Sequence, residues 1–249
     1  MCLIVVGWRV HPDYPLVLAA NRDEFYARPT ANAARWPDAP QVFGGIDLEA
    51  GGTWLGITET GRFAAITNVR EPNMAKGAIS RGALTRDFLL ADTPAQTYAK
   101  QLDDSAYAGF NLLLGDGESL VYCSNRCRQA RELAPGIYGL SNHLLDSPWP
   151  KLIKAREGFT QALKHLPDEA SFFALLADQS IVSDELLPQT GVPLEWERLL
   201  SAVFVKSENY GTRASTLLWQ RADGMVKLHE QSFGANGSPL QSSVISTSL

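Results

Sequence analysis

Blocks of short apolar runs alternate along this chain with blocks of helical periodicity, and this order constrains the fold more than any other feature. Strand-like runs come first, helical patterns follow near residues 81–102, and strands then return. A second helical block covers 150–177, and strands close the chain. Antiparallel hairpins with helices in separate blocks are typical of two sheets packed face to face with helices outside them. The sequence therefore predicts an α+β fold of this layered kind.

The expected strands are the apolar or β-branched runs at 3–8, 16–20, 53–57, 63–67, 110–114, 120–123, 137–140, 202–205, 214–219 and 225–231. The expected helices cover 81–91, 94–102, 150–166 and 168–177. Residues 26–51 and 179–198 are predicted to be irregular loops, and the Ser-rich last dozen residues are expected to fray. No linker-like composition divides the chain, so we expect one domain over residues 1–249.

Composition argues against several classes of function. Of the 249 residues, 45% are hydrophobic and 20% are charged, which is typical of a soluble globular protein. The net charge of −5 gives no support for binding to nucleic acid, which usually needs a basic face. The apolar runs are too short for a transmembrane segment. Because the first expected strand starts without a basic leader, we expect a cytoplasmic protein.

The three cysteines, an odd number, argue against a disulfide framework. Cys123 and Cys127 have neither the spacing of a redox pair nor that of a zinc knuckle, and the four histidines are scattered. We therefore expect no metal site.

Cys2 stands at the start of the first expected strand and is the leading candidate for chemistry. Removal of Met1 would free its α-amino group, whose ordinary pKa of about 8 makes it a usable base beside the thiol. A thiol with an adjacent base is the minimal requirement for nucleophilic catalysis. The alternative is an ordinary buried cysteine that packs as a small hydrophobic residue.

Four polar residues, Asn21-Arg22-Asp23-Glu24, directly follow the expected strand at 16–20. A hairpin would return the end of this strand to the start of the first, where Cys2 lies. Arg22 could then lower the pKa of the thiol, and Asp23 could accept a hydrogen bond from the α-amino group. The alternative is a solvated turn with an internal ion pair.

Three further polar residues, Asn68, Asn142 and Arg213, lie at the ends or edges of apolar strands. Asparagine side-chain amides can donate to a developing oxyanion, a contribution commonly worth about 3–4 kcal/mol of the barrier. Each residue alone could equally be a turn or cap residue. Polar groups at several strand ends are nevertheless what a shared site requires.

These residues belong to an ordered series of motifs that resembles the NRDE family, whose eukaryotic members are called transport and Golgi organization protein 2. The resemblance runs from residue 1 to about residue 220. It rests on Met1-Cys2, the Asn21-Arg22-Asp23-Glu24 tetrad, Gly52-Thr53-Trp54-Leu55-Gly56, Thr67-Asn68, Phe110-Asn111-Leu112-Leu113, Gly139-Leu140-Ser141-Asn142 and Tyr210-Gly211-Thr212-Arg213.

That family in turn is similar to the N-terminal-nucleophile (Ntn) hydrolases, and above all to the cysteine acylases that cleave penicillin V and conjugated bile salts. This resemblance implies a four-layer αββα sandwich with Cys2 as nucleophile. It implies that Arg22 and Asp23 match the Arg and Asp near the acylases' second strand, and that Asn68 is an oxyanion donor. By the same resemblance, Asn142 and Arg213 match a second Asn and a late Arg, whereas the role of Glu24 stays open.

Three hypotheses follow. The first is a Cys2-dependent hydrolase of a small amide or thioester that needs no cofactor, in which Asn68 and Asn142 stabilise the oxyanion. Residues 26–51, with Tyr26, Trp36 and Phe43, would shape its pocket or else form a mobile surface excursion. The second is a non-catalytic protein that binds or traffics haem or an acyl lipid on the same fold. Candidate haem ligands by residue type are His11, His143, Cys123 and Cys127. The third is a scaffolding role, which would leave the polar strand ends unexplained.

Overall fold

The computed structural model describes residues 2–72 and 77–247, and in this part of the chain the strands form two antiparallel sheets. The six-stranded sheet contains, in spatial order, β10 (Gly136–Leu140), β1 (Cys2–Trp8), β2 (Leu16–Phe25), β11 (Tyr210–Gln220), β12 (Val226–Phe233) and β13 (Pro239–Thr247). The seven-stranded sheet contains β3 (Thr30–Trp36), β4 (Ala39–Asp47), β5 (Leu55–Thr58), β6 (Phe63–Asn68), β7 (Phe110–Gly115), β8 (Leu120–Ser124) and β9 (Cys127–Glu132).

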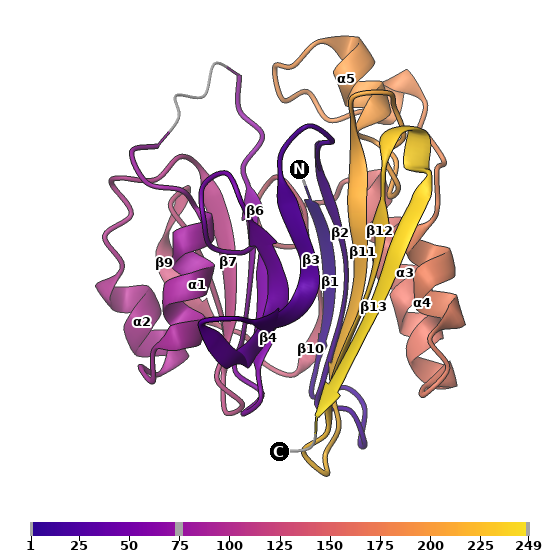
Figure 1. Ribbon diagram of the computed structural model, residues 1–249. Coiled ribbons are helices and arrows are strands. Elements are labelled where there is room, and N and C mark those ends of the chain that lie inside the picture. The colour runs from indigo at the N-terminus through magenta and orange to yellow at the C-terminus, as the bar shows by residue number, and fades with distance from the viewer. Residues whose placement is uncertain (1, 73–76, 248–249) are drawn as a thin grey trace.

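Helices cover the outer face of each sheet (Figure 1). On the seven-stranded sheet lie α1 (Gly82–Leu90) and α2 (Ala95–Gln101), and on the six-stranded sheet lie α3 (Pro150–Ala162) and α4 (Ala170–Leu176). A short α5 (Leu194–Leu199) lies at one end of the sandwich. The predicted α+β fold with four αββα layers is therefore confirmed. None of the helices in the described residues is both long and apolar enough to cross a membrane.

The unbroken apolar run of β1 is explained by burial on both of its faces. Ile4 and Val6 point into the core between the sheets, whereas Leu3 and Val5 point into the core beneath α3 and α4. Successive side chains of a strand alternate between faces, so every position of a strand that is buried on both faces favours an apolar residue. This strand carries Cys2 at its first position and fixes it in the framework.

Residues 26–51 are not an irregular loop, and that prediction was wrong. Most of this segment forms the β3–β4 hairpin. Its small and polar residues hide the strand pattern, because β3 is an edge strand with register shifts and few large apolar side chains. Trp36 and Phe43, which were predicted to shape a pocket, are buried in two different hydrophobic cores instead.

Other predictions about local structure were wrong in whole or in part, and one strand was not predicted. Residues 179–198 contain most of α5, and the buried segment 202–205 is not a strand. Strand β9 was missed because its polar sequence shows no apolar alternation. The tail does not fray as a whole, because β13 pairs with β12 from Pro239 to Thr247. Backbone pairing with a neighbouring strand can order a segment that has little apolar surface of its own.

Candidate active site

A cavity of about 130 Å³ lies at the end of the sandwich where β1 begins, and it gathers residues from both sheets. Cys2 opens β1, Arg22 and Asp23 lie near the end of β2, and Asn68 is the last residue of β6. All four residues line the cavity. The β1–β2 pairing sets Cys2 directly opposite Arg22, so the hairpin brings the tetrad to the cysteine as predicted from the sequence.

Cys2 is partly buried, and its thiol is not activated by its surroundings alone. Burial raises the pKa of the Cys2 thiol above its ordinary value. The negative charge of Asp23 raises this pKa further, whereas the positive charge of Arg22 lowers it. Because the net direction is upward, the thiol is neutral at neutral pH and needs a base. The predicted removal of Met1 concerns a residue outside the described part of the chain.

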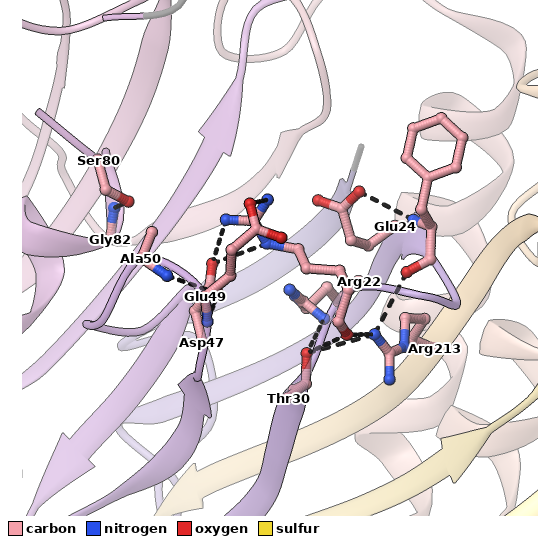
Figure 2. Close-up of polar contacts among 11 residues, drawn as sticks. Arg22, Glu24, Thr30, Asp47, Glu49, Ala50, Ser80, Gly82 and Arg213 are labelled. Carbon is pink, nitrogen blue, oxygen red and sulfur yellow. Dashed lines mark hydrogen bonds and ion pairs between the residues drawn. The ribbon is translucent and has the colours of Figure 1, made fainter. Parts of the chain in front are cut away.

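Arg22 is held in place from two sides. Its guanidinium carbon lies 4.2 Å from the centre of the Trp54 ring, a cation–π contact. Its Nη1 donates to Thr30 Oγ1 at 3.3 Å, and Figure 2 shows Arg22 and Arg213 both reaching this threonine. Trp54 also lines the cavity and was not singled out from the sequence as a site residue. The Gly52-to-Gly56 motif was the only signal that could have identified it.

Asp23 is buried beneath the cavity. Its Oδ1 accepts a hydrogen bond from Thr212 Oγ1 at 2.7 Å, and its main-chain oxygen accepts one from the Tyr210 hydroxyl at 3.2 Å. Burial raises the pKa of the Asp23 carboxyl, while the positive charges of Lys151 and Arg70 and the bond from Thr212 oppose that rise. Tyr210 and Thr212 belong to the same motif as Arg213, so the motif contributes directly to the site.

Buried charged residues behind Asp23 were not predicted. Lys151, in the first turn of α3, is buried and donates to the main-chain oxygen of Leu200 at 2.9 Å. Burial lowers the pKa of Lys151 to about 8, and the charge of Asp23 opposes this shift. Arg70 forms a buried ion pair with Glu197 of α5 at 2.6 Å. A charged residue in a helical or loop pattern normally indicates a solvated position, so no local pattern indicated this burial.

Asn142 lies behind Asn68 and does not line the described part of the cavity. Asn142 is fully buried, and its Nδ2 donates to the main-chain oxygen of Asn68 at 3.1 Å and to Asn68 Oδ1 at 2.9 Å. These bonds fix the side-chain amide of Asn68. Among the described residues, the Nδ2 of Asn68 makes a long contact, 3.4 Å, with the main-chain oxygen of Val69.

Two further hydrogen bonds lie at this point, of which the first joins the two sheets and the second lies on the side of the six-stranded sheet. Thr67 Oγ1, at the end of β6, donates to the main-chain oxygen of Ser141 at 2.6 Å. Ser141 Oγ then donates to the main-chain oxygen of Cys2 at 2.9 Å. Ser141 therefore links the end of β6 to the start of β1, at the residue that carries the thiol.

Arg213 also lies outside the described lining of the cavity. The pairing of β11 with β2 shifts register between Thr212 and Ala214, so Arg213 sits in a β-bulge. Its Nη1 donates to the main-chain oxygens of Phe25 and Arg28 and to Thr30 Oγ1. Arg213 therefore holds the turn between β2 and β3, next to Arg22 (Figure 2).

A polar rim surrounds the cysteine, and Figure 2 shows part of it. Arg28 pairs with Asp47 at 2.7 Å and with Glu49 at 3.0 Å. Glu24, whose role the sequence left open, lines the cavity and accepts a hydrogen bond from the main-chain N–H of Phe25 at 2.8 Å. Arg81, just before α1, donates to the main-chain oxygen of Gly109 at 3.0 Å. The rim also takes in Ser80 and Gly82.

A second, larger cavity of about 540 Å³ is lined by Val69, the residue that follows Asn68. Its lining is mixed: Val69, Leu144 and Trp149 contribute apolar surface, and Arg70, Glu71 and Arg126 contribute charge. His143, a candidate haem ligand by residue type, also lines this cavity. Its Nδ1 lies 2.7 Å from Ser147 Oγ.

The layers and the position of the site define the class of fold. The crystal structure of the C2A mutant of conjugated bile acid hydrolase from Clostridium perfringens matches this chain with a TM-score of 0.50. The match covers 98% of this chain and 92% of that chain at 10% sequence identity. At such low identity the likeness concerns the fold alone, which is that of the Ntn hydrolases.

Sequence comparison identifies the family. Residues 1–235 match the family described as Transport and Golgi organisation 2. The Transport and Golgi organization protein 2 homolog of Bos taurus is 38% identical over 258 residues, and that of Homo sapiens is 36% identical over 256 residues. Each match covers 93% of this chain and 93% of the relative. The chain belongs to the Transport and Golgi organisation 2 family, which confirms the resemblance found in its motifs.

Proposed function

We propose that this chain, after removal of Met1, hydrolyses a small amide or thioester through Cys2. The observation that carries the proposal is that Cys2, Arg22, Asp23 and Asn68 line one cavity, although they come from three strands in two sheets. A thiol, a cation, a carboxylate and an amide donor are the groups that acyl transfer requires. The volume of about 130 Å³ suits a small group at the reacting carbonyl. The proposed site of action is the cytoplasm.

The first step is attack by the thiol. Because burial and Asp23 raise the pKa of Cys2, the proton must leave as the sulfur–carbon bond forms. The free α-amine of Cys2 accepts this proton, and Asp23 orients the amine by accepting a hydrogen bond from it. Lys151 and Arg70 favour the ionised form of Asp23, since their positive charges oppose the effect of burial on its pKa. Arg22 stabilises the developing thiolate by charge.

The second step is release of the acyl group. The carbonyl oxygen becomes an oxyanion, to which Asn68 Nδ2 donates. Collapse of the intermediate breaks the carbon–nitrogen or carbon–sulfur bond, and the protonated α-amine returns its proton to the leaving group. Water then attacks the acyl-cysteine by the same route, which releases a carboxylic acid and restores the thiol. Asn142 and Arg213 act as positioning residues for Asn68 and for the turn beside Arg22. No cofactor takes part.

One observation favours a second candidate function, the binding of an apolar ligand without catalysis. The cavity of about 540 Å³ has the size of a small-molecule site, and apolar side chains make up about half of its lining. Haem or an acyl chain would lie against the apolar part of this lining. If haem binds there, His143 is the residue that would hold it, through Nε2, because Nδ1 is engaged by Ser147.

The deciding experiment for the hydrolase is intact-mass analysis of the protein purified from cells, before and after reaction with an activated thioester of a small acid. We expect loss of the mass of Met1 and addition of one acyl group, mapped to Cys2 by peptide sequencing. The Cys2→Ala variant should take up no label, whereas Cys127→Ser, which alters another partly exposed cysteine, should label normally. Retention of Met1 in the purified protein would contradict the mechanism.

Titration with haem tests the second candidate on the same preparation. Binding that gives a Soret band and is lost in His143→Ala, but not in Cys2→Ala, would establish a ligand site in the larger cavity. A Soret band that persists in His143→Ala would contradict the proposed ligation.

A further inference from the structure

A second cluster of nucleophile, base and carboxylate lies on the outer face of the six-stranded sheet, beside α4. His229 of β12 is its centre: Nδ1 lies 2.7 Å from Glu169 Oε2, and Nε2 lies 3.1 Å from Ser242 Oγ on β13. These three residues are absent from the described lining of the Cys2 cavity. A hydroxyl within reach of a base that is itself oriented by a third group is the arrangement that activates a nucleophile.

The partners of His229 determine which ring nitrogen carries the proton. An ionised carboxylate can only accept hydrogen bonds, so the neutral ring must bear its proton on Nδ1, toward Glu169. Nε2 then presents its lone pair to Ser242, whose hydroxyl is the donor. In this tautomer His229 is set to take the proton of Ser242.

Glu169 is fixed as an ionised group. Its Oε1 accepts hydrogen bonds from Trp219 Nε1 at 3.0 Å and from Lys227 Nζ at 2.8 Å. Burial acts to raise the pKa of Glu169, but the hydrogen bonds from Lys227, His229 and Trp219 outweigh it, so the pKa is lowered. The ring of Phe173 packs edge-on against His229, with centroids 4.6 Å apart, and limits rotation of the imidazole.

Ser242 is accessible, because it is exposed on the edge strand β13. Leu240 and Val244 lie two residues to either side, on the same face of the strand, and are 67% and 56% exposed. The main-chain N–H of Gln241 donates inward to Ser232 Oγ. Since these groups alternate in direction along a strand, the N–H of Ser242 faces the open edge and can donate to an oxyanion.

We propose that Ser242 is a second nucleophile of this protein, acylated by small apolar activated esters. Ser242 Oγ forms a bond to the ester carbonyl carbon while its proton passes to His229 Nε2. The ester carbon–oxygen bond then breaks, and the leaving alcohol takes the proton from His229. Leu240 and Val244 provide the apolar contact for the acyl group. Water attacks acyl-Ser242 by the same base assistance and restores the hydroxyl.

A fluorophosphonate probe tests this proposal, because Ser242 Oγ would displace fluoride to form a stable phosphonate ester. The reaction is run on the full chain in a Cys2→Ala background, which removes the first nucleophile. We expect peptide mapping to place the label on Ser242 and the Ser242→Ala variant to remove it. His229→Gln should slow labelling about 100-fold, the size of contribution that a positioned base makes.

Ser246 is the matched control, because it is exposed on the same face of β13 four residues further along. Glu169→Gln gives a second variant that keeps the shape of the carboxylate, and it should also slow labelling while circular dichroism shows an intact fold. Labelling of Ser242 at the rate of Ser246, or labelling unaffected by His229→Gln in a folded variant, would overturn the proposal. Neither outcome bears on Cys2, so the two proposals fail independently.

Discussion

The side-chain amide of Asn142 donates to both oxygens of Asn68, at 3.1 Å to the main-chain oxygen and at 2.9 Å to Oδ1. Asn68 ends β6 in one sheet, and Asn142 follows β10 in the other. The orientation of the cavity-lining amide is therefore set by a residue that does not line the described cavity itself. Holding a donor in a fixed orientation before the reaction is what makes an oxyanion contact effective.

We therefore expect Asn142→Ala to impair both stability and acylation of Cys2. The substitution leaves Asn68 Oδ1 without a buried donor, which costs about 1–3 kcal/mol in the free energy of unfolding. Urea denaturation measures this loss, and the rate of thioester hydrolysis should fall by about 100-fold or more. Asn32→Ala is the control, because it removes an exposed hydrogen bond to Gln241 and should change neither quantity appreciably. A variant that loses stability but keeps full activity would contradict the positioning role.

Replacing Asp23 by Asn should raise the free energy of unfolding near neutral pH but lower the rate of hydrolysis. Burial raises the folded-state pKa of Asp23, so the folded protein binds a proton here more tightly than the unfolded chain does. Stability contributed by this group is therefore lost as the pH rises from the unfolded pKa of about 3.9 through the folded pKa. Asp23→Asn removes this loss, so the variant should gain stability relative to the wild type between pH 4 and pH 7. Thioester hydrolysis should nevertheless fall by about 10²–10⁴-fold.

Denaturation of both proteins at the two pH values measures the difference. A difference in the free energy of unfolding that is the same at pH 4 and pH 7 would contradict the assigned shift.

The sequence was sufficient for the hairpin that builds the site. The β-branched run at 3–8 and the apolar run at 16–20 are buried on both faces, so their pattern reports directly on the structure. The turn residues between them limited the choice of register, and Cys2 pairs with Arg22 in consequence. The position of the tetrad next to the cysteine followed from these local signals alone.

Other parts of the site depend on contacts that a local pattern does not contain. Lys151 and Glu197 lie in helical segments whose charged residues normally face water, and their burial arises only when α3 and α5 meet near Arg70 and Asp23. The β3–β4 hairpin likewise depends on tertiary contacts. Its edge strand β3 has little apolar alternation and is ordered by pairing with β4 and by a hydrogen bond from Ala33 N–H to the buried Glu230. Tertiary contacts outweigh local propensity at such positions.

Lys151 should give the protein a rise in stability at alkaline pH. Its folded pKa of about 8 lies below the unfolded value of about 10.4, so the unfolded chain holds this proton more tightly over that interval. The free energy of unfolding therefore increases as the pH rises from about 8 to about 10.4. Lys151→Met should lack this increase, and guanidinium denaturation at pH 7, 9 and 10 would measure it. The same slope in wild type and variant would show that another group is responsible.

Replacing one partner of the buried ion pair between Arg70 and Glu197 should lower the free energy of unfolding strongly. Replacing both partners by apolar residues should lower it much less. Glu197→Gln leaves the Arg70 guanidinium charged and buried, and we expect a loss of about 3–5 kcal/mol in the free energy of unfolding. The double variant Arg70→Met with Glu197→Leu should recover most of that loss, because neither charge then remains to be desolvated. Urea denaturation measures both.

Arg198→Ala provides the comparison. Arg198 follows Glu197 directly in α5, and its ion pair with Asp184 is exposed, so breaking that pair should hardly change the free energy of unfolding. Arg70 also lies in the electrostatic environment of Asp23, so the double variant should raise the pKa of Asp23 further and slow thioester hydrolysis even where stability is restored. A stable double variant with undiminished hydrolysis would show that Arg70 supports the fold of this end of the sandwich but does not tune the carboxylate.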